Sequence, residues 1–304
     1  MRAVTFQAPG EVRVDEVPDP EPIAASDAIV RVEATGIGRA TAERLAAGGW
    51  KVYATARRLE SIADLAAKGC ETLALDVTDE ASMEAAVEHV EDAEGAVGVL
   101  INNAGSSQSG AVETVPMDEV RRQFETNVFG LVRMCQLVLP GMRRQRWGRI
   151  VNLSSMGGRL VFPGGGLYHG TKYAVEAISD ALRFEVRDFG VDVILIEPGL
   201  IRTAFGETAV HGVTESVPAD GPYAEFNTAV AAATANVYEN GALAKLGGPP
   251  EAVAKRIAKA ITATRPRARY TVTPSARALI GQHAVLPDAA WDAVMRTQFP
   301  QPGQ

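Results

Sequence analysis

Tyr168 and Lys172 stand four residues apart, a spacing at which two side chains of a helix lie on one face. A phenol beside a fixed ammonium can do acid–base chemistry, because the positive charge favours phenolate and lowers the pKa of the tyrosine towards working pH. Thirteen residues ahead of Tyr168, Ser155 follows an apolar run from Ile150 to Leu153 that is typical of a buried strand. A hydroxyl at that strand end can hydrogen-bond the oxygen that reacts, so these three side chains predict a catalytic site.

The elements that must position these side chains alternate along the chain between short apolar strands and helices. We expect strands at 51–55, 72–75, 97–101, 149–153, 193–196 and 269–273, and helices at 36–46, 117–144, 166–189 and 250–264. Two more helices lead into the second and third of these strands. Such alternation indicates a parallel sheet covered on both faces. The predicted fold class is α/β, a doubly wound Rossmann-type sheet with a C-terminal helical extension.

Composition and charge argue against several classes of protein. The chain has 304 residues, 46% of them hydrophobic, and a formal net charge of −7. An acidic chain offers no basic footprint for nucleic acid and no polybasic membrane patch. No apolar run reaches the roughly 18 residues that span a bilayer, and the start does not read as a signal peptide. Cys70 and Cys135 lie far apart in apolar segments, as buried free thiols do. We therefore predict a cytoplasmic protein without a membrane span.

Motifs at the ends of other expected strands match the same kind of site. Asn-Asn-Ala-Gly follows one strand at 102–105, and Pro-Gly-Leu-Ile-Arg-Thr follows another at 198–203. Together with the serine, tyrosine and lysine above, these motifs resemble the short-chain dehydrogenase/reductase family over residues 36–273. The resemblance implies an oxidoreductase that moves a hydride between a nicotinamide cofactor and a ketone or alcohol.

The resemblance also implies a catalytic tetrad, because Asn127 stands where the family places the asparagine that completes it. Tyr168 would be the general acid in ketone reduction and the general base in alcohol oxidation. Ser155 would orient and polarise the substrate oxygen, Lys172 would lower the pKa of the tyrosine, and Asn127 would anchor a water that relays protons.

By the same resemblance, cofactor-binding residues lie at the carboxyl ends of the strands, where open parallel sheets bind ligands. Asp76 and Val77 would hold the adenine. Ile201 and Thr203 would hold the nicotinamide carboxamide, and Lys172 would also reach its ribose. The full set is Gly36, Ile37, Gly38, Arg57, Asp76, Val77, Asn103, Ala104, Gly105, Tyr168, Lys172, Pro198, Gly199, Ile201 and Thr203.

Ala56 occupies the position where NAD enzymes of this fold place an acid for the ribose 2′-hydroxyl, and Arg57 comes next. A carboxylate there would repel a 2′-phosphate, whereas a guanidinium can hold it with paired hydrogen bonds. These residue types favour NADP over NAD. The alternative is that Arg57 and Arg58 are simply a solvated helix start.

The beginning of the chain does not fit the family. The family's pyrophosphate loop reads Thr-Gly-x-x-x-Gly-x-Gly, and here only its end survives, as Gly36-Ile37-Gly38. Residues 1–35 resemble instead the start of zinc-dependent medium-chain alcohol dehydrogenases, but Gly38-Arg39 stands where that family has a zinc-binding cysteine. We therefore predict no metal. Arg31 and Glu33 would bring charges into a central strand, which is unfavourable. Because the glycine loop is altered, we expect the cofactor to bind more weakly than in an intact relative.

The chain is expected to have three parts: a foreign segment at 1–35 that supplies or replaces the first strand, a catalytic domain at 36–273 with a substrate lid at 204–245, and an extension at 274–304. The altered loop leaves open the alternative of a catalytically impaired scaffold or binding protein. A zinc medium-chain dehydrogenase is a further alternative, which the missing cysteines disfavour.

Apolar residues predict the substrate class. They follow Ser155 and lie in the expected lid, and they comprise Val161, Phe162, Leu167, Phe205, Tyr223 and Phe226. Such a lining suits a small apolar carbonyl or alcohol, which could be steroid-, retinoid- or lipid-like or aromatic. We expect His169 in a loop near the substrate mouth. Since many relatives pair through the helices that hold Asn127 and Tyr168, we also expect a homodimer or homotetramer.

Overall fold

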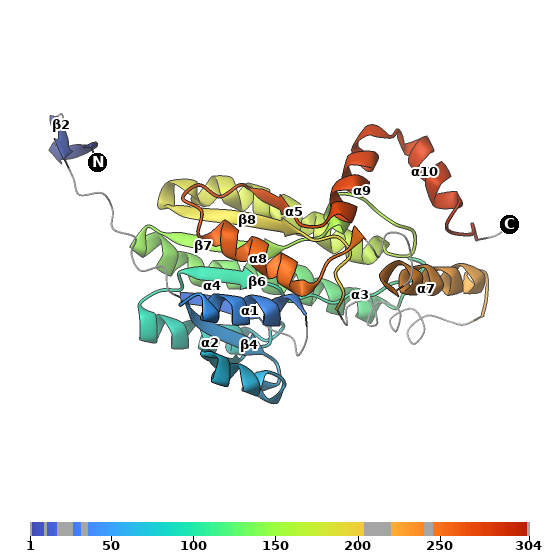
Figure 1. Cartoon of the computed structure of the whole chain (residues 1–304), viewed down its shortest axis with the longest axis horizontal. Coiled ribbons are helices and arrows are strands. Elements are labelled where there is room, and N and C mark those ends of the chain that lie inside the picture. Colours follow the sequence, from blue (N-terminus) through green and yellow to red (C-terminus); the bar gives the residue numbers. More distant parts are fainter. Residues whose placement is uncertain are drawn as a thin grey trace.

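Seven parallel strands form the sheet that organises the chain (Figure 1). The computed structural model describes residues 2–8, 11–16, 27–31, 36–203, 220–239 and 246–302. The order reverses between two central strands, and beside such a reversal doubly wound sheets bind their ligands. The predicted doubly wound α/β fold is therefore confirmed. From edge to edge the strands are β5 (Cys70–Ala74), β4 (Lys51–Ala56), β3 (Asp27–Arg31), β6 (Val99–Asn102), β7 (Gly148–Leu153), β8 (Val191–Glu197) and β9 (Arg269–Thr271).

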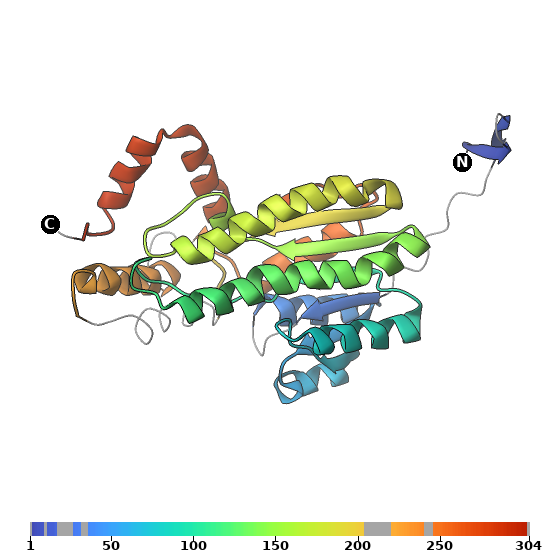
Figure 2. The ribbon, with the colours of Figure 1, turned by 180° about the vertical axis from the view of Figure 1, so that it is seen from behind.

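Helices cover both faces of this sheet (Figures 1 and 2). Along β4, Val52 and Ala54 pack into one apolar cluster and Tyr53 into the other, because successive side chains of a strand point to opposite faces. Burial on both faces explains why the strands read as continuous apolar runs. One cluster includes α1 (Ile37–Ala47), the 3-10 helix η1 (Leu59–Lys68) and α8 (Pro250–Ile261), and the other includes α2 (Glu80–Glu94), α4 (Gly130–Gln145) and α5 (Gly166–Val186).

One predicted helix was wrong in detail. The helix expected after β4 is present as the 3-10 helix η1. The helix expected at 117–144 is divided, because α3 (Met117–Phe124) is followed by a π-helical turn, η2 (Glu125–Phe129), and only then by α4. Gly130 closes the π-turn against the loop after β5, where a β-carbon on it would lie 2.8 Å from Cβ of Val77. Such single π-turns are frequent at functional sites.

The amino-terminal segment supplies a central strand of the sheet. β3 pairs in parallel with β4 on one side and with β6 on the other. Ahead of it, β1 (Arg2–Ala8) and β2 (Glu11–Glu16) form an antiparallel sheet of two strands that is separate from the large one. The altered glycine loop at 32–35, with Glu33, lies outside the described residues.

The carboxyl-terminal segment packs on the chain that follows β7. It contains α9 (Pro274–Val285) and α10 (Asp288–Arg296), which lie at the same end of the molecule as α7 (Ala224–Glu239) (Figures 1 and 2). Trp291 of α10 forms a cluster with Leu160. Residues 204–219, with Phe205, and 240–245 of the expected lid lie outside the described residues.

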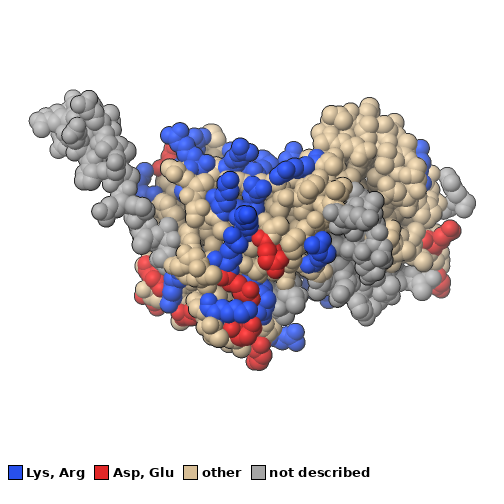
Figure 3. All heavy atoms as spheres, in the orientation of Figure 1, with Lys and Arg blue, Asp and Glu red and all other residues tan. Residues whose placement is uncertain are grey.

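The described surface is mixed in charge on the face that α8 covers (Figure 3). Lys255 and Lys259 on α8, and Arg265 and Arg267 after it, are exposed. Acidic side chains lie beside basic ones lower on the same face (Figure 3). None of the helices that the structure describes is long and apolar enough to cross a membrane.

Candidate active site

Lys172 is held with its ammonium buried. It lies on α5, and its Nζ donates a hydrogen bond of 2.8 Å to the carbonyl oxygen of Leu153, the last residue of β7. The same nitrogen lies 5.8 Å from the ring centre of Tyr168. Burial disfavours the charged form and lowers the pKa of Lys172 to about 8. The predicted phenol–ammonium pair is therefore present on one face of α5.

Ser155 stands at the end of β7, where its strand turns into a short 3-10 helix, η3 (Met156–Gly158). Its Oγ accepts a hydrogen bond of 3.0 Å from the backbone N–H of Gly157, so the hydroxyl proton remains available for an acceptor. The backbone N–H of Met156 donates to the carbonyl of Pro198 at 2.8 Å. That bond ties the serine segment to the predicted cofactor loop after β8.

Asn127 is buried in the π-turn and makes three hydrogen bonds. Its Oδ1 accepts from the backbone N–H of Ser106 at 2.8 Å, and its Nδ2 donates to the carbonyl of Ser106 at 2.9 Å and to Thr171 Oγ1 at 3.0 Å. Thr171 is the residue before Lys172. The amide of Asn127 thus joins the loop after β6 to the helix that carries the tyrosine and the lysine.

The loop after β6 reaches the same place. A β-carbon built on Gly105 would lie 3.5 Å from Asn127 Oδ1 and 3.7 Å from Lys172 Nζ. Gly105, in the predicted Asn-Ala-Gly segment at 103–105, therefore lies directly against two of the predicted tetrad residues.

His169 corrects a prediction, because it lies on α5 rather than in a loop and is only 7% exposed. Its Nδ1 lies 3.0 Å from the carbonyl of Gly157, and its Nε2 accepts from the N–H of Phe162 at 3.3 Å. The carbonyl can only accept, so the neutral ring carries its proton on Nδ1. A β-carbon on Gly165 would lie 2.7 Å from its Nε2. The buried imidazole therefore holds the loop between Ser155 and Tyr168 through Gly157 and Phe162.

The predicted cofactor residues lie at the carboxyl edge of the sheet. Gly36 has φ of +112° at the start of α1, a conformation that favours glycine, and a β-carbon there would lie 3.5 Å from Cγ2 of Thr203. Gly36, in the remaining part of the glycine loop, therefore lies against the segment after β8. Ile37, Gly38, Ala104, Pro198, Gly199 and Ile201 lie in these same segments.

Two further predicted cofactor residues differ in how they are held. Asp76 Oδ1 accepts from the N–H of Thr78 at 3.0 Å and from its hydroxyl at 2.9 Å, which fixes the turn that leads to Val77. Arg57 follows β4 with an exposed side chain. Within the part of the chain that the structure describes, no ion pair of Arg57 is present.

The sequence did not single out Thr171 or Asn152 as parts of the site, and it gave Asn102 no role of its own within the Asn-Asn-Ala-Gly motif. Asn102 Nδ2 donates to Asn152 Oδ1 at 2.9 Å, and Asn152 Nδ2 donates to Ser179 Oγ at 2.9 Å. This buried ladder joins β6, β7 and α5 beneath the catalytic residues. A polar residue inside each apolar strand run is the signal that could have revealed it. No group of three or more His, Cys, Asp or Glu among the described residues is arranged to hold a metal.

Comparison with known proteins identifies the family. A family model described as short chain dehydrogenase matches residues 27–213. The chain belongs to the short-chain dehydrogenase family. It is therefore an oxidoreductase by family, with the strand order, serine segment and Tyr-x-x-x-Lys helix described above.

Individual members of this family resemble the chain along most of its length. It is 34% identical to an NADPH-dependent 3-dehydrocapnine reductase of Ornithobacterium rhinotracheale over 276 residues, which are 88% of this chain and 95% of that protein. A 3-ketodihydrosphingosine reductase of Bacteroides thetaiotaomicron is 42% identical over 172 residues, which cover 56% of this chain and 62% of that protein. A solved short-chain dehydrogenase from Streptomyces avermitilis matches 91% of this chain and 99% of its own, with a TM-score of 0.75 and 34% identity.

Proposed function

We propose that this short-chain dehydrogenase is an NADP(H)-dependent reductase that interconverts a ketone and a secondary alcohol on an apolar substrate. The observation that carries the proposal is the pair on α5, in which a buried Lys172 ammonium, fixed by the carbonyl of Leu153, lies beneath the ring of Tyr168. Such a pair has no evident use in a purely structural helix, since burying a cation is unfavourable.

The chain's own residues would divide the work as follows. Tyr168 would donate its phenolic proton to the carbonyl oxygen in reduction and accept it in oxidation. Ser155 would donate a hydrogen bond to the same oxygen, and Lys172 would favour the phenolate when the proton leaves. The oxygen and the nitrogen of the Asn127 side-chain amide are both already hydrogen-bonded. Its main-chain carbonyl would therefore be the group that holds the proton-relaying water. The nicotinamide, when bound, would supply or take the hydride.

The described residues fit a dinucleotide along the carboxyl edge of the sheet. The start of α1 offers N–H groups and the positive end of a helix dipole to a phosphate, and Gly36 lets the backbone approach it. Asp76–Val77, Asn103–Gly105 and 198–203 would line the rest of the cofactor, as the resemblance implies. The exposed guanidinium of Arg57 would hold a 2′-phosphate. An NADPH-dependent relative at 34% identity supports this choice.

The substrate class is supported by the apolar wall around the loop after Ser155. Phe162 packs with Trp291 of the C-terminal helix, at 6.2 Å between ring centres, and Val161 is 41% exposed. The names of two relatives, a 3-dehydrocapnine and a 3-ketodihydrosphingosine reductase, favour a lipid-like ketone over the steroid, retinoid and aromatic alternatives. The α7 helix would serve as part of the lid, since Asn227 Oδ1 accepts from the N–H of Ala111 at 3.0 Å.

The amino-terminal segment differs in character from the catalytic domain in this proposal. We propose that residues 1–35 resemble a medium-chain dehydrogenase start and supply the first strand of the sheet. The pairing of β3 on both sides supports the place of that strand, and the family match that begins at residue 27 limits the foreign character to the residues before it. The extension at 274–304 would be a separate addition. We also propose that the protein is cytoplasmic and that two or four copies pair through α4 and α5, on which Phe184 is 86% exposed.

The first experiment is titration of the purified protein with NADPH and with NADH, followed by cofactor fluorescence. We expect saturable binding that is tighter for NADPH, and oxidation of NADPH when long-chain 3-keto compounds are added. A submicromolar dissociation constant would refute the weakened binding that we predict from the altered loop. No binding up to millimolar cofactor, from protein with a cooperative unfolding transition, would overturn the proposed function and favour the impaired scaffold.

A further inference from the structure

Glu176 is a buried acid that the proposed mechanism does not use. It lies on α5 one turn after Lys172, on the same face, and is only 6% exposed. Its Oε2 accepts from Arg269 Nε at 2.9 Å, whereas its Oε1 has no hydrogen-bond partner among the described residues. A buried carboxylate oxygen left in this state is costly unless a nearby charge compensates.

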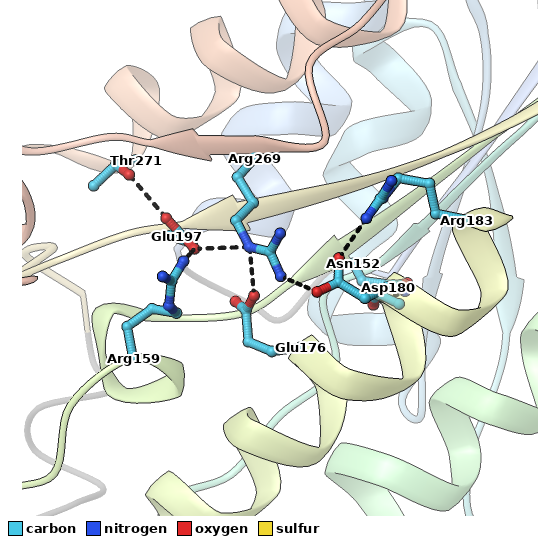
Figure 4. Close-up of polar contacts among 9 residues, drawn as sticks. Asn152, Arg159, Glu176, Asp180, Arg183, Glu197, Arg269 and Thr271 are labelled. Carbon is cyan, nitrogen blue, oxygen red and sulfur yellow. Dashed lines mark hydrogen bonds and ion pairs between the residues drawn. The ribbon is translucent and has the colours of Figure 1, made fainter. Parts of the chain in front are cut away.

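Arg269 of β9 contacts three acids, two on α5 and one on β8 (Figure 4). Its guanidinium lies 2.9 Å from Glu176, 2.6 Å from Asp180 and 3.4 Å from Glu197. Each of the other two acids has a second cationic partner, since Asp180 pairs with Arg183 at 2.9 Å and Glu197 with Arg159 at 3.1 Å. Among the described residues, Glu176 has no second cation within ion-pair distance. The remaining cation near it is Lys172.

The catalytic segments meet around Glu176. A β-carbon on Gly158 would lie 2.9 Å from Glu176 Cγ and 3.1 Å from the carbonyl oxygen of Lys172. The serine loop therefore passes directly over the acid. The charge of Glu176 raises the pKa of Lys172, against the burial that lowers it. Burial raises the pKa of Glu176 itself, and so does the charge of Glu197, whereas Arg269 acts in the opposite direction.

We propose that Glu176 is a positioning residue whose carboxylate, held ionised by Arg269, keeps the buried Lys172 ammonium charged while Tyr168 exchanges its proton. This rests on the proposed function for its consequence in catalysis, but its electrostatic part concerns the free protein. The charged and titrating groups around Lys172 are Tyr168, His169, Glu176 and Asp180 of α5, Arg159 after η3, Glu197 of β8 and Arg269 of β9. Of the three acids among them, Glu176 is one turn from the ammonium and Asp180 is two.

The sign of the effect does not depend on which group titrates. Loss of one proton from the Tyr168–Lys172 pair removes a positive charge, and a nearby carboxylate opposes that loss. Replacing Glu176 by glutamine removes the negative charge that opposes loss of the proton, while keeping the shape of the side chain. The apparent pKa of the pair must then fall, whether the ammonium or the phenol gives up its proton.

The test is an NMR titration of the cofactor-free protein labelled with 13C at the lysine ε-carbons. The Lys172 signal is assigned by its loss in Lys172→Met. In Glu176→Gln we expect the pKa of Lys172 to fall by about one unit, the lower end of what a close opposite charge causes. Asp180→Asn is the matched control, since it removes another acid from the same arginine one turn farther away, and it should leave the Lys172 pKa nearly unchanged.

A second variant covers the case in which Glu176→Gln does not fold. Glu176→Met removes the same charge without leaving a buried amide to be hydrogen-bonded, so the Lys172 pKa should again fall. Glu176→Asp keeps the charge and should restore the wild-type value. An unchanged Lys172 pKa in both Glu176→Gln and Glu176→Met would overturn the inference.

Activity provides the second readout. The alkaline limb of the pH profile of kcat for ketone reduction should move to lower pH in Glu176→Gln by the same shift as in the NMR titration, and it should stay in place in Asp180→Asn. A Lys172 shift in a protein that reduces no ketone would leave the electrostatic role standing and count against the proposed function instead. A lower kcat without any shift of the limb would mean that Glu176 has only a structural role.

Discussion

The catalytic half and the cofactor half of the site are built differently. In the catalytic half, Asn127 and Lys172 are buried, and each is fixed by hydrogen bonds of 2.8 to 3.0 Å to other segments. In the cofactor half, Arg57 is exposed and has no ion pair with a described residue, and Gly36 carries only backbone. Groups that move a proton must stand in place before the substrate arrives, because catalysis depends on preorganised geometry. A phosphate ligand can order its own contacts on binding.

The largest expected effect breaks the catalytic half alone. Tyr168→Phe removes the phenolic proton and keeps the ring over Lys172, so kcat should fall by about 10²- to 10⁴-fold, the usual contribution of a general acid. The dissociation constant of NADPH should change little. Stopped-flow or steady-state assays measure the first, and fluorescence titration the second.

Tyr173→Phe is the matched control for this variant. Tyr173 lies on the same helix but is 41% exposed, so its hydroxyl should be dispensable for turnover. Full activity in Tyr168→Phe would remove the tyrosine from the mechanism and leave the helix pair without its proposed role.

The second effect tests the cofactor half. Arg57→Ala should weaken NADPH binding by about 10- to 100-fold, the value of one charge-assisted hydrogen-bonding pair, and leave NADH binding unchanged. Arg58→Ala is the control, since it removes a charge of the same sign at the next residue. Equal losses for NADPH and NADH would mean that Arg57 acts through general attraction of anions rather than through the 2′-phosphate.

The same contrast explains what the sequence could predict. Tyr168, Lys172 and Ser155 were found because helix spacing and strand ends are local features that a sequence displays directly. The doubly wound parallel sheet followed from the alternation of strands and helices. The bonds that fix the site join segments far apart in the chain, such as Asn127 with Ser106 and Thr171, and no local pattern reports them.

The π-turn and His169 show two further limits. The segment 117–144 was expected as one helix, because the π-turn has no sequence signal of its own and helical residues continue on both sides of it. His169 was expected in a loop. Gly157 and Gly165 are instead packed against its ring, and this close contact could be seen only in three dimensions.

The third effect tests whether the π-turn must lie close to the cofactor loop. Gly130→Ala places a β-carbon 2.8 Å from Cβ of Val77, so the helix or the loop must shift. Overpacking of this kind should lower the free energy of unfolding by about 1–3 kcal/mol. Urea denaturation measures it.

Gly281→Ala supplies the control for that substitution. Gly281 lies in α9, and a β-carbon there meets nothing within 4 Å. Its replacement should be neutral or should stabilise by about 0.5–1 kcal/mol, as alanine does in an open helix interior. Loss of stability in both variants would mean that the contact with Val77 is not the cause.

The smallest effect concerns the pH dependence of the loop that His169 fastens. Burial lowers the pKa of His169, so the unfolded chain takes up a proton before the folded one does as the pH falls. The stability due to the neutral ring is therefore fully present above about pH 6.5, the ordinary histidine value, and is lost as the pH falls towards the folded pKa. In His169→Gln, the decline of unfolding free energy between pH 7 and 5.5 should become shallower by at most about 1.4 kcal/mol per pH unit. His89→Gln, which removes an exposed imidazole, is the comparison. If His169→Gln keeps the wild-type slope, the ring does not fasten the loop as a neutral acceptor, and the preorganisation of the catalytic half must come from Asn127 and Lys172 alone.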